Sequence, residues 1–383
     1  MRRLITHAVA VTALFYAWRS ARALAGWMRV PAVDVLDDGP LLSIVVPARN
    51  EERNIEGCVR SLLAQAGVEI EVIVVDDGST DATAPILAQL QREFPALQVV
   101  SGEPLPDGWV GKPWACAQGA RLARGEWLLF TDADSRHEPA ACASTLAFAR
   151  VHGADALSIM TGQELGTFAE AALLPAILQM IVFACGPLRE INDPRHPDRA
   201  LANGQYLLVS RVAYDALGGH DALRHSMVED IEFARRLKRD GRFRLVVAEG
   251  TQLVRVRMYH SFRELWDGFT KNMYLGARGD VGAIAGGVVF CAALSVAPPL
   301  LALAALRRGQ RGLAAEALAV TALVVAVAAQ GATYVSIPRR LAVFAPLGIA
   351  MFGAIALNST RRAVTGAGFD WRGRHYPARN DAT

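Results

Sequence analysis

Three long apolar stretches lie near the C-terminal end of this 383-residue chain. Short basic links separate them, and they cover Val281–Leu306, Ala317–Ile337 and Leu341–Leu357. About 20 apolar residues suffice to cross the hydrocarbon core of a bilayer, so each stretch is a candidate transmembrane helix. Pro298 and Pro299 interrupt the first stretch, which is therefore either kinked or re-entrant. We expect two or three transmembrane helices within residues 281–357 and a basic tail over residues 358–383.

The N-terminus carries a further apolar run. Arg2 and Arg3 precede a mostly apolar segment over Leu4–Trp18, and arginines follow at positions 19, 22 and 29. Positively charged residues flank the cytosolic ends of membrane helices. Residues 1–30 are therefore predicted to form an uncleaved membrane anchor or, as the alternative, an interfacial helix.

The composition indicates that an ordinary folded domain accompanies these stretches. Hydrophobic residues make up 52% of the chain and charged residues 20%, against about 25% charged in soluble proteins. The net charge of +3 argues against a nucleic-acid-binding protein, which needs a basic face. The odd number of cysteines, with no C-x-x-C pair, argues against a disulfide framework or a zinc site and is typical of a reducing cytosol. They are Cys58, Cys116, Cys142, Cys185 and Cys291.

Acidic residues follow three short apolar runs in the first half of the chain. Glu51 and Glu52 come shortly after the run Leu41–Val46, which ends at Pro47. The runs Ile70–Val75 and Trp127–Thr131 end in Asp76-Asp77 and in Asp132-Ala133-Asp134. Continuous apolar runs of this length are typical of parallel strands that are buried on both faces. Helical patterns follow the first two runs, so we expect an open α/β sheet whose ligands bind beyond the carboxyl ends of the strands.

These carboxylates suit a nucleotide diphosphate and a metal ion. Asp132 and Asp134 can share a hard divalent cation with diphosphate oxygens, because Mg²⁺ is typically held by one or two carboxylates plus phosphates. Asp76 and Asp77 offer acceptors for ribose hydroxyls or base N–H groups. Neither a P-loop nor a G-x-G-x-x-G motif follows the first strand, which excludes those nucleotide-binding folds.

Four segments together resemble the ordered signature of family 2 glycosyltransferases. They are Pro47–Glu52, Val74–Asp81, Thr131–Asp134 and Glu229–Asp230. Gly111–Ala115 is similar to the family's lysine-bearing segment ahead of the Asp-x-Asp strand. The resemblance covers about residues 41–275 and implies an inverting enzyme with the GT-A fold, a Rossmann-like α/β domain that binds nucleotide sugars.

The same resemblance implies roles for individual residues. Asp132 and Asp134 would bind the metal, Mg²⁺ or Mn²⁺, and Lys112 would pair with the diphosphate as a point charge. The residues that would bind the nucleotide sugar are Pro47, Glu51, Asp76, Asp77, Lys112 and Asp132.

Asp230 would be the catalytic base that takes a proton from the acceptor hydroxyl. It lies at the start of a helical pattern through Ile231, Phe233, Ala234 and Leu237. We expect the helix N-terminus to keep its carboxylate ionised. The alternative is that Glu229 and Asp230 are ordinary first-turn residues favoured by the helix dipole.

Four further residues carry weaker indications. Tyr206 and His220 lie in segments that resemble the acceptor side of the family, and either could instead be a packing residue. Membrane-bound relatives often carry a Gln/Arg-x-x-Arg-Trp motif after the base. Here Arg263 and Trp266 stand three residues apart instead of adjacent, which favours transfer of a single sugar over polymerisation.

The apolar stretch Phe168–Leu188 lies between the Asp-x-Asp and the base. A single membrane crossing there would place metal site and base on opposite sides, so the stretch must return, lie flat or be buried. Glu170, Pro175 and Gln179 suit an interfacial helix, which would place the acceptor pocket at the bilayer surface; a core helix is the alternative. Ile191–Arg195 and Trp371–Tyr376 resemble the subgroup associated with hopanoid and carotenoid glycosylation.

We therefore expect an inverting glycosyltransferase that moves one sugar from a nucleotide sugar, with UDP favoured, to a hydroxyl of a membrane lipid. The resemblance places it in the inner (cytoplasmic) membrane with the catalytic domain facing the cytosol. A polyprenyl-phosphate sugar synthase is one alternative. The other is a non-catalytic sugar-lipid translocator or scaffold.

Overall fold

The computed structural model describes residues 2–377, which form two compact units. The sheet unit comprises residues 27–164 and 190–258. The helical unit comprises residues 2–26, 165–189 and 259–377. The chain therefore leaves the sheet unit and returns to it once, by way of residues 165–189.

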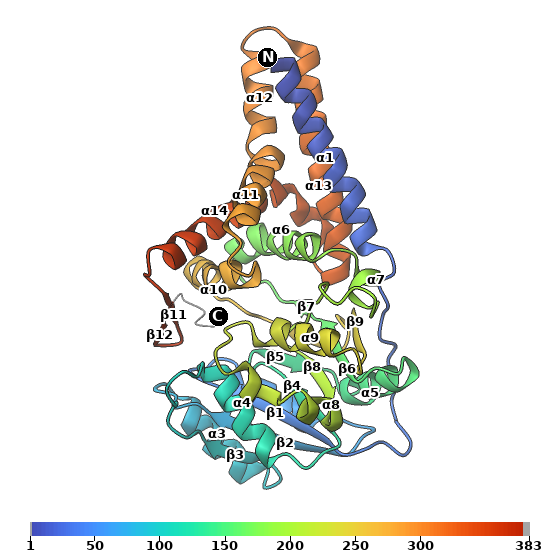
Figure 1. The fold of residues 1–383 in the computed structure, drawn as a ribbon, viewed down its shortest axis with the longest axis vertical. Helices are drawn as coiled ribbons and strands as arrows, with labels where there is room; N and C mark the ends of the chain where they lie inside the picture. Colours follow the sequence, from blue (N-terminus) through green and yellow to red (C-terminus); the bar gives the residue numbers. More distant parts are fainter. Residues whose placement is uncertain (1, 378–383) are drawn as a thin grey trace. The chain divides into compact units, whose positions relative to one another are not determined.

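A seven-stranded sheet forms the centre of the sheet unit (Figure 1), in the order β3-β2-β1-β4-β8-β6-β9. The first four of these strands are parallel, β8 is antiparallel to both of its neighbours, and β9 is parallel to β6. The strands are β1 (Leu42–Ala48), β2 (Ile70–Asp76), β3 (Gln98–Ser101), β4 (Trp127–Phe130), β6 (Ala156–Met160), β8 (Leu207–Ser210) and β9 (Leu245–Glu249). The three predicted apolar strands are thus confirmed as β1, β2 and β4.

The register brings the carboxyl ends of these strands to one edge. Ala48 at the end of β1 lies opposite Asp76 at the end of β2, and Val45 of β1 lies opposite Phe130 of β4. The residues from Leu42 to Val46 are all buried, as expected for a strand with helices on both faces. The acidic segments that follow β1, β2 and β4 therefore share one edge of the sheet.

Helices and a small sheet complete this unit. Gly119 of α4 lets that helix approach β1 closely, because a Cβ at this position would lie 2.4 Å from Cγ1 of Val45. The helices are α2 (Ile55–Leu63), α3 (Thr83–Glu93), α4 (Gly111–Leu122), α5 (Ala141–Val151), α8 (Arg211–Ala216), the 3-10 turn η1 (Gly219–Leu223) and α9 (Glu229–Asp240). The small sheet has the order β5 (Ser135–His137), β10 (Val254–Val256), β7 (Gly162–Gln163). The short helix α7 (Leu188–Ile191) stands where the chain passes from the helical unit to the sheet unit.

The helical unit has its own apolar core. Five of its helices each contribute a buried side chain, namely Tyr16, Met180, Leu294, Val324 and Ile349. Its elements are α1 (Arg2–Leu24), α6 (Phe168–Cys185), α10 (Phe262–Gly276), α11 (Val281–Ser295), α12 (Ala297–Leu306), α13 (Arg311–Gly331), the 3-10 turns η2 (Ala332–Val335) and η3 (Arg339–Phe344), α14 (Ala345–Val364), and the hairpin β11 (Phe369–Trp371) and β12 (Arg374–Tyr376).

Four helical segments among the described residues are long and apolar enough to cross a membrane. They are Phe168–Cys185, Val281–Leu306, Arg311–Val335 and Arg339–Val364. The last three correspond to the three C-terminal stretches expected from the sequence. The segment Val281–Leu306 bends at Val296, shortly before Pro298 and Pro299, where α11 ends and α12 begins. The N-terminal helix α1 is not among the four, and Val9, Ala13 and Tyr16 on it are buried.

The helix α6 runs across the direction of α1, α12 and α13 in Figure 1. A capping box begins it, in which Thr167 accepts from the backbone of Glu170 while the Glu170 carboxylate accepts from the backbone of Thr167. Glu170 is buried, which removes an acidic side chain from the surface of this apolar helix. The expectation that Phe168–Leu188 returns, lies flat or is buried stays a prediction, because α6 is also one of the four segments that are long and apolar enough to cross a membrane.

Two predicted boundaries differ from the units of the structure. Residues 165–189 and 259–275, inside the predicted 41–275 domain, cluster with the helical unit because α6 and α10 both pack against α14. The predicted tail over 358–383 begins inside α14 and continues into the β11–β12 hairpin. Its last six residues lie outside the described residues.

Candidate active site

The loops after β1 and β2 are joined by hydrogen bonds. The Asn50 side chain accepts from the backbone N–H of Thr80 at 2.8 Å, and the Asn50 backbone N–H donates to Oγ of Ser79 at 3.0 Å. The Glu51 backbone N–H donates to Oγ1 of Thr83 at 2.8 Å. Asn50 has a φ of +54°, a left-handed conformation that asparagine tolerates better than most residues. The two loops therefore form one rigid rim above the ends of β1 and β2.

Most of the predicted nucleoside-binding residues lie on or beside this rim. Asp77 is buried, and Arg49 donates to its backbone carbonyl. The Asp76 carboxylate accepts from the Ser79 backbone N–H at 3.0 Å. The Glu51 carboxylate accepts from the Asn54 side chain at 3.0 Å. The carboxylates of Asp76 and Glu51 thus orient the rim itself, and the nucleoside-binding role of all three residues stays a prediction.

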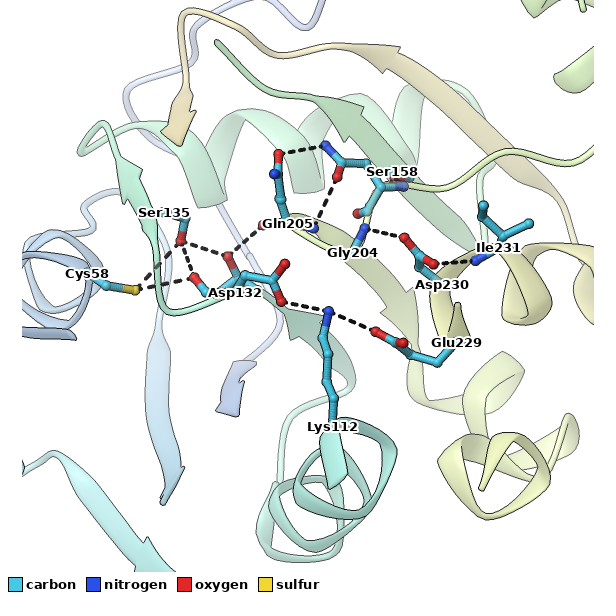
Figure 2. Close-up of polar contacts among 12 residues, drawn as sticks. Cys58, Lys112, Asp132, Ser135, Ser158, Gly204, Gln205, Glu229, Asp230 and Ile231 are labelled. Carbon is cyan, nitrogen blue, oxygen red and sulfur yellow. Dashed lines mark hydrogen bonds and ion pairs between the residues drawn. The ribbon is translucent and has the colours of Figure 1, made fainter. Parts of the chain in front are cut away.

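Lys112, at the start of α4, joins two carboxylates from different parts of the chain. Its Nζ lies 2.7 Å from Oδ1 of Asp132 and 2.7 Å from Oε1 of Glu229, as Figure 2 shows. Burial disfavours the ammonium, but the negative charges of Asp132, Glu229 and Asp230 outweigh it and hold the pKa of Lys112 well above its usual value. Lys112 is therefore a permanent cation between the Asp-x-Asp segment and the first turn of α9.

Asp230 occupies the first turn of α9, where two backbone N–H groups bind its carboxylate. Gly204 donates to Oδ2 at 2.7 Å and Ile231 donates to Oδ1 at 2.8 Å (Figure 2). Burial, followed by the negative charge of Glu229, raises the pKa of Asp230 to about 6, although Lys112 and the two N–H groups act in the opposite direction. The expectation that the helix N-terminus keeps this carboxylate ionised therefore holds only above about pH 6.

Lys112, Glu229 and Asp230 line one cleft in the sheet unit. Its lining residues are Pro47, Lys112, Cys116, Phe130, Thr131, Gly204, Leu207, His220, Glu229 and Asp230. The cleft brings together residues separated by up to 183 positions, from Pro47 to Asp230. Pro47, Lys112, Glu229 and Asp230 are predicted site residues that the structure places in it.

Gly204 is a functional position that the sequence analysis missed. A Cβ at this position would lie 2.9 Å from Nζ of Lys112 and 3.2 Å from Oδ2 of Asp230. Any side chain here would displace one of the two charged groups. The Asn203-Gly204 pair in the segment before β8 was the available signal, because such a dipeptide marks a tight turn.

Asp132 and Asp134 follow β4 and suit a metal bound jointly by the protein and a diphosphate. Among residues 2–377, no group of three or more His, Cys, Asp or Glu side chains is arranged to hold a metal ion. Mg²⁺ and similar ions typically use one or two carboxylates and take their remaining ligands from phosphates and water. The two aspartates fit that arrangement, in which the substrate supplies the missing ligands.

The side chains of Tyr206 and His220, two of the weaker predictions, are both buried, and His220 also lines the cleft. Tyr206 is fully buried, and its hydroxyl lies 2.6 Å from Oγ1 of Thr145. His220 packs edge-on against Phe130, its Nδ1 lies 2.9 Å from the Tyr214 hydroxyl, and burial lowers its pKa to about 3. The side chain of Tyr206 is enclosed in the core, as expected for a packing residue, and its acceptor role stays a prediction.

The other two weaker predictions lie on α10 of the helical unit. Arg263 is highly exposed and pairs with Asp267 at 3.7 Å. The ring of Trp266 contacts that of Phe262. Their part in an active site stays a prediction.

Three similarities to known proteins accord with this geometry. Residues 43–170 match the family model described as "Glycosyl transferase family 2". The 4,4'-diaponeurosporenoate glycosyltransferase of Staphylococcus aureus (strain USA300) is 27% identical over 349 residues, which cover 88% of each chain. The mannosyltransferase PcManGT from Pyrobaculum calidifontis, solved with GDP-Man and Mn²⁺, superposes with a TM-score of 0.53 at 19% identity. That superposition covers 93% of this chain and 99% of the other, and at this identity it shows a shared fold.

Proposed function

We propose that this chain, whose residues 43–170 match the family 2 glycosyltransferase model, is an enzyme that moves one sugar from a nucleotide sugar to a membrane lipid with inversion at the anomeric carbon. The observation that supports the proposal is the cleft lined by Asp230, Lys112 and Glu229, in which Lys112 pairs with both Glu229 and Asp132. A base and a set of groups for a diphosphate stand together there. Inversion requires a base on one side of the sugar and a diphosphate site on the other, because the acceptor attacks the face opposite the leaving group.

Asp230 acts as the general base. Its carboxylate accepts the proton of an acceptor hydroxyl while the hydroxyl oxygen bonds to the anomeric carbon. The bond from that carbon to the diphosphate breaks, and its electron pair leaves with the nucleoside diphosphate. The N–H groups of Gly204 and Ile231 hold the carboxylate in place throughout.

Lys112 stabilises the departing diphosphate. Its ammonium is a compact point charge that can exchange a carboxylate partner for a phosphate oxygen. Asp132 and Asp134 are the residues that would hold Mg²⁺ or Mn²⁺, and such an ion would neutralise developing negative charge on the leaving group. The rim formed by the loops after β1 and β2 holds the nucleoside.

A lipid is the acceptor that fits the rest of the chain best. The diaponeurosporenoate glycosyltransferase is similar over 88% of this chain, and that share extends beyond the family 2 domain. Four segments are long and apolar enough to cross a membrane, and α6 lies crosswise among the helices. We infer that the protein resides in the cell membrane, with the sheet unit on the cytosolic side where nucleotide sugars are made.

The direct test is transfer of label to lipid. Membranes containing the full-length protein are incubated with radiolabelled nucleotide sugars, UDP-sugars first, and the lipids are then extracted. We expect label from one donor in a single lipid species. Label in a polymer would contradict single transfer. The absence of label with every donor, together with no binding of a UDP-sugar, would favour the non-catalytic translocator.

Substitution of the base tests the mechanism. We expect Asp230→Asn to lose most turnover while it keeps nucleotide-sugar binding, because the amide keeps the size of the carboxylate but accepts no proton, and its NH2 group cannot accept from one of the two backbone N–H groups. The matched control is Asp221→Asn. Asp221 is exposed, and its carboxylate pairs with Arg121, with 2.8 Å between Nη2 and Oδ1. Only a mild loss in Asp230→Asn would favour an acceptor that is already an anion, such as the polyprenyl phosphate of the alternative.

A further inference from the structure

A second charged residue of α9 makes contacts that the mechanism above does not use. Lys238 is buried, and its Nζ donates to the backbone carbonyls of Glu190, Ile191 and Arg199. The three distances are 3.2, 2.6 and 2.6 Å. An ammonium has three donors and no acceptor capacity, so these carbonyls satisfy it completely.

All three carbonyls belong to the segment that leads to the catalytic cleft. We name residues 190–204 the strap. The Asn192 side chain fixes the strap to β9, because it accepts from the Val247 N–H at 2.7 Å and donates to the Val247 carbonyl at 2.9 Å. The Asn203 backbone N–H donates to Oγ of Ser158 on β6 at 2.8 Å.

The strap ends at the residue that holds the base. The backbone N–H of Gly204 donates to Oδ2 of Asp230 at 2.7 Å. Asp230 and Lys238 stand on the same helix, about two turns apart at 3.6 residues per turn. The strap is therefore tied to α9 by two residues: Lys238 binds its first two residues and Arg199, and Asp230 binds Gly204 at its end.

We propose that Lys238 is a positioning residue, whose ammonium clamps the strap to α9 and thereby sets the position of Gly204 against the Asp230 carboxylate. The inference rests on the proposed function, because it assigns Lys238 a part in the same transfer. No other lysine can substitute for it, since the chain contains only Lys112, Lys238 and Lys271.

The clamp has a titratable strength. Burial lowers the pKa of Lys238 to about 8, and the negative charge of Asp193 opposes the shift. Two other charged side chains of the strap, Glu190 and Arg199, approach each other at 3.8 Å, and on α9 Arg235 pairs with Glu232. As pH rises through about 8, Lys238 loses a proton and its amine can satisfy only two of the three carbonyls. The clamp is thus complete below that pH and weakened above it.

Kinetics of Lys238→Met test the proposal, because methionine keeps most of the apolar stem and removes the ammonium. We expect kcat to fall about ten- to a hundredfold with little change in the KM for the donor, the scale for a misplacement of about 1 Å. The alkaline limb of the wild-type kcat profile near pH 8 should disappear in the variant. Lys271→Met is the matched control, since Lys271 lies over the Trp371 ring in the helical unit.

An unchanged kcat would overturn the proposal, and so would a lower kcat whose alkaline limb stays in place. The second outcome would mean that Lys238 only stabilises the fold. Lys238→Arg adds a check, because its planar fork keeps the charge but does not match three carbonyls arranged around a point. We expect this variant to lie between wild type and Lys238→Met in kcat.

Hydrogen exchange of the full-length protein provides a readout that needs no transfer. We expect the amides of residues 190–204 to exchange faster in Lys238→Met, while those of residues 49–54 and 77–83 keep wild-type rates. If that variant does not fold, wild-type protection is compared between about pH 7 and about pH 9 after correction for intrinsic exchange, and loss confined to the strap is expected. Equal protection would overturn the clamp. If wild type labels no lipid, the proposed function fails while this measurement still decides the clamp.

Discussion

At the scale of single residues, the cleft depends on one cation among several carboxylates. Lys112 contacts Asp132 and Glu229. Gly204 lies between Lys112 and Asp230, and a Cβ at this position would be within 3.2 Å of both Nζ of Lys112 and Oδ2 of Asp230. The arrangement leaves no room for a Cβ at position 204. The positions of the charged groups of Lys112 and Asp230 therefore depend on the absence of a side chain at Gly204.

Gly204→Ala should abolish most transfer. The added methyl group would lie 2.9 Å from Nζ of Lys112 and 3.2 Å from Oδ2 of Asp230, so one of them must move. We expect a loss of about a hundredfold or more in kcat, as for other displacements of about 1 Å in a reacting geometry. Gly276→Ala is the control, because a Cβ there meets nothing within 4 Å. Equal activity in the two variants would contradict the crowding described here.

The pH profile should report the state of Asp230. The active base is the carboxylate, and burial with Glu229 raises its pKa to about 6 from 3.8. Activity should therefore fall as pH drops through about 6, on the acid side of a plateau that ends at the alkaline limb near pH 8 assigned to Lys238. The measurement is kcat against pH at saturating donor and acceptor. An acid limb near pH 4, where an ordinary aspartate titrates, would show that the site does not raise this pKa.

At the scale of elements, the rim depends on two loops that meet after β1 and β2. Asn50 joins them through its side chain and adopts a left-handed backbone.

Asn50→Ala should weaken UDP-sugar binding and lower Tm, because it loses a hydrogen bond worth about 1 kcal/mol and strains the backbone by about 1–2 kcal/mol. Asn50→Gly should have an intermediate effect, since glycine relieves the strain but not the lost bond. Calorimetric titration with UDP and thermal unfolding measure the two effects, and equal values for both variants would contradict the role of the left-handed conformation.

At the scale of the whole molecule, apolar surface indicates attachment to a membrane. The four candidate segments are each at most 44% buried within the structure, so much of their apolar surface is left for lipid. We expect the full-length protein to stay in the membrane pellet after washing with alkaline carbonate, which removes peripheral proteins. Salt extraction alone should release none of it. Release by carbonate would contradict transmembrane insertion.

The parts of the fold that the sequence predicted are those governed by local pattern. The strands β1, β2 and β4 are continuous apolar runs ended by acidic residues, and the apolar stretch with two prolines bends where expected. The division between the units was not predictable in this way. Residues 165–189 look like an insertion in the sheet domain, and their assignment to the helical unit depends on packing against α14, more than 150 positions later.

The sequence by itself determined which carboxylates gather at one edge of the sheet, because parallel strands present their carboxyl ends to the same side and the polar residues follow those ends directly. It also determined that much of the chain suits a lipid environment, since that depends only on run length and composition. The tertiary structure decided that Tyr206 packs in the core, that Gly204 leaves room for the base and that Lys238 holds the strap. It also raised the pKa of Asp230, because the burial that contributes most to this shift arises only when distant segments meet, whereas the Glu229 charge comes from the adjacent residue in the sequence. Contacts between residues far apart in the chain leave no local pattern, so only the folded structure could establish them.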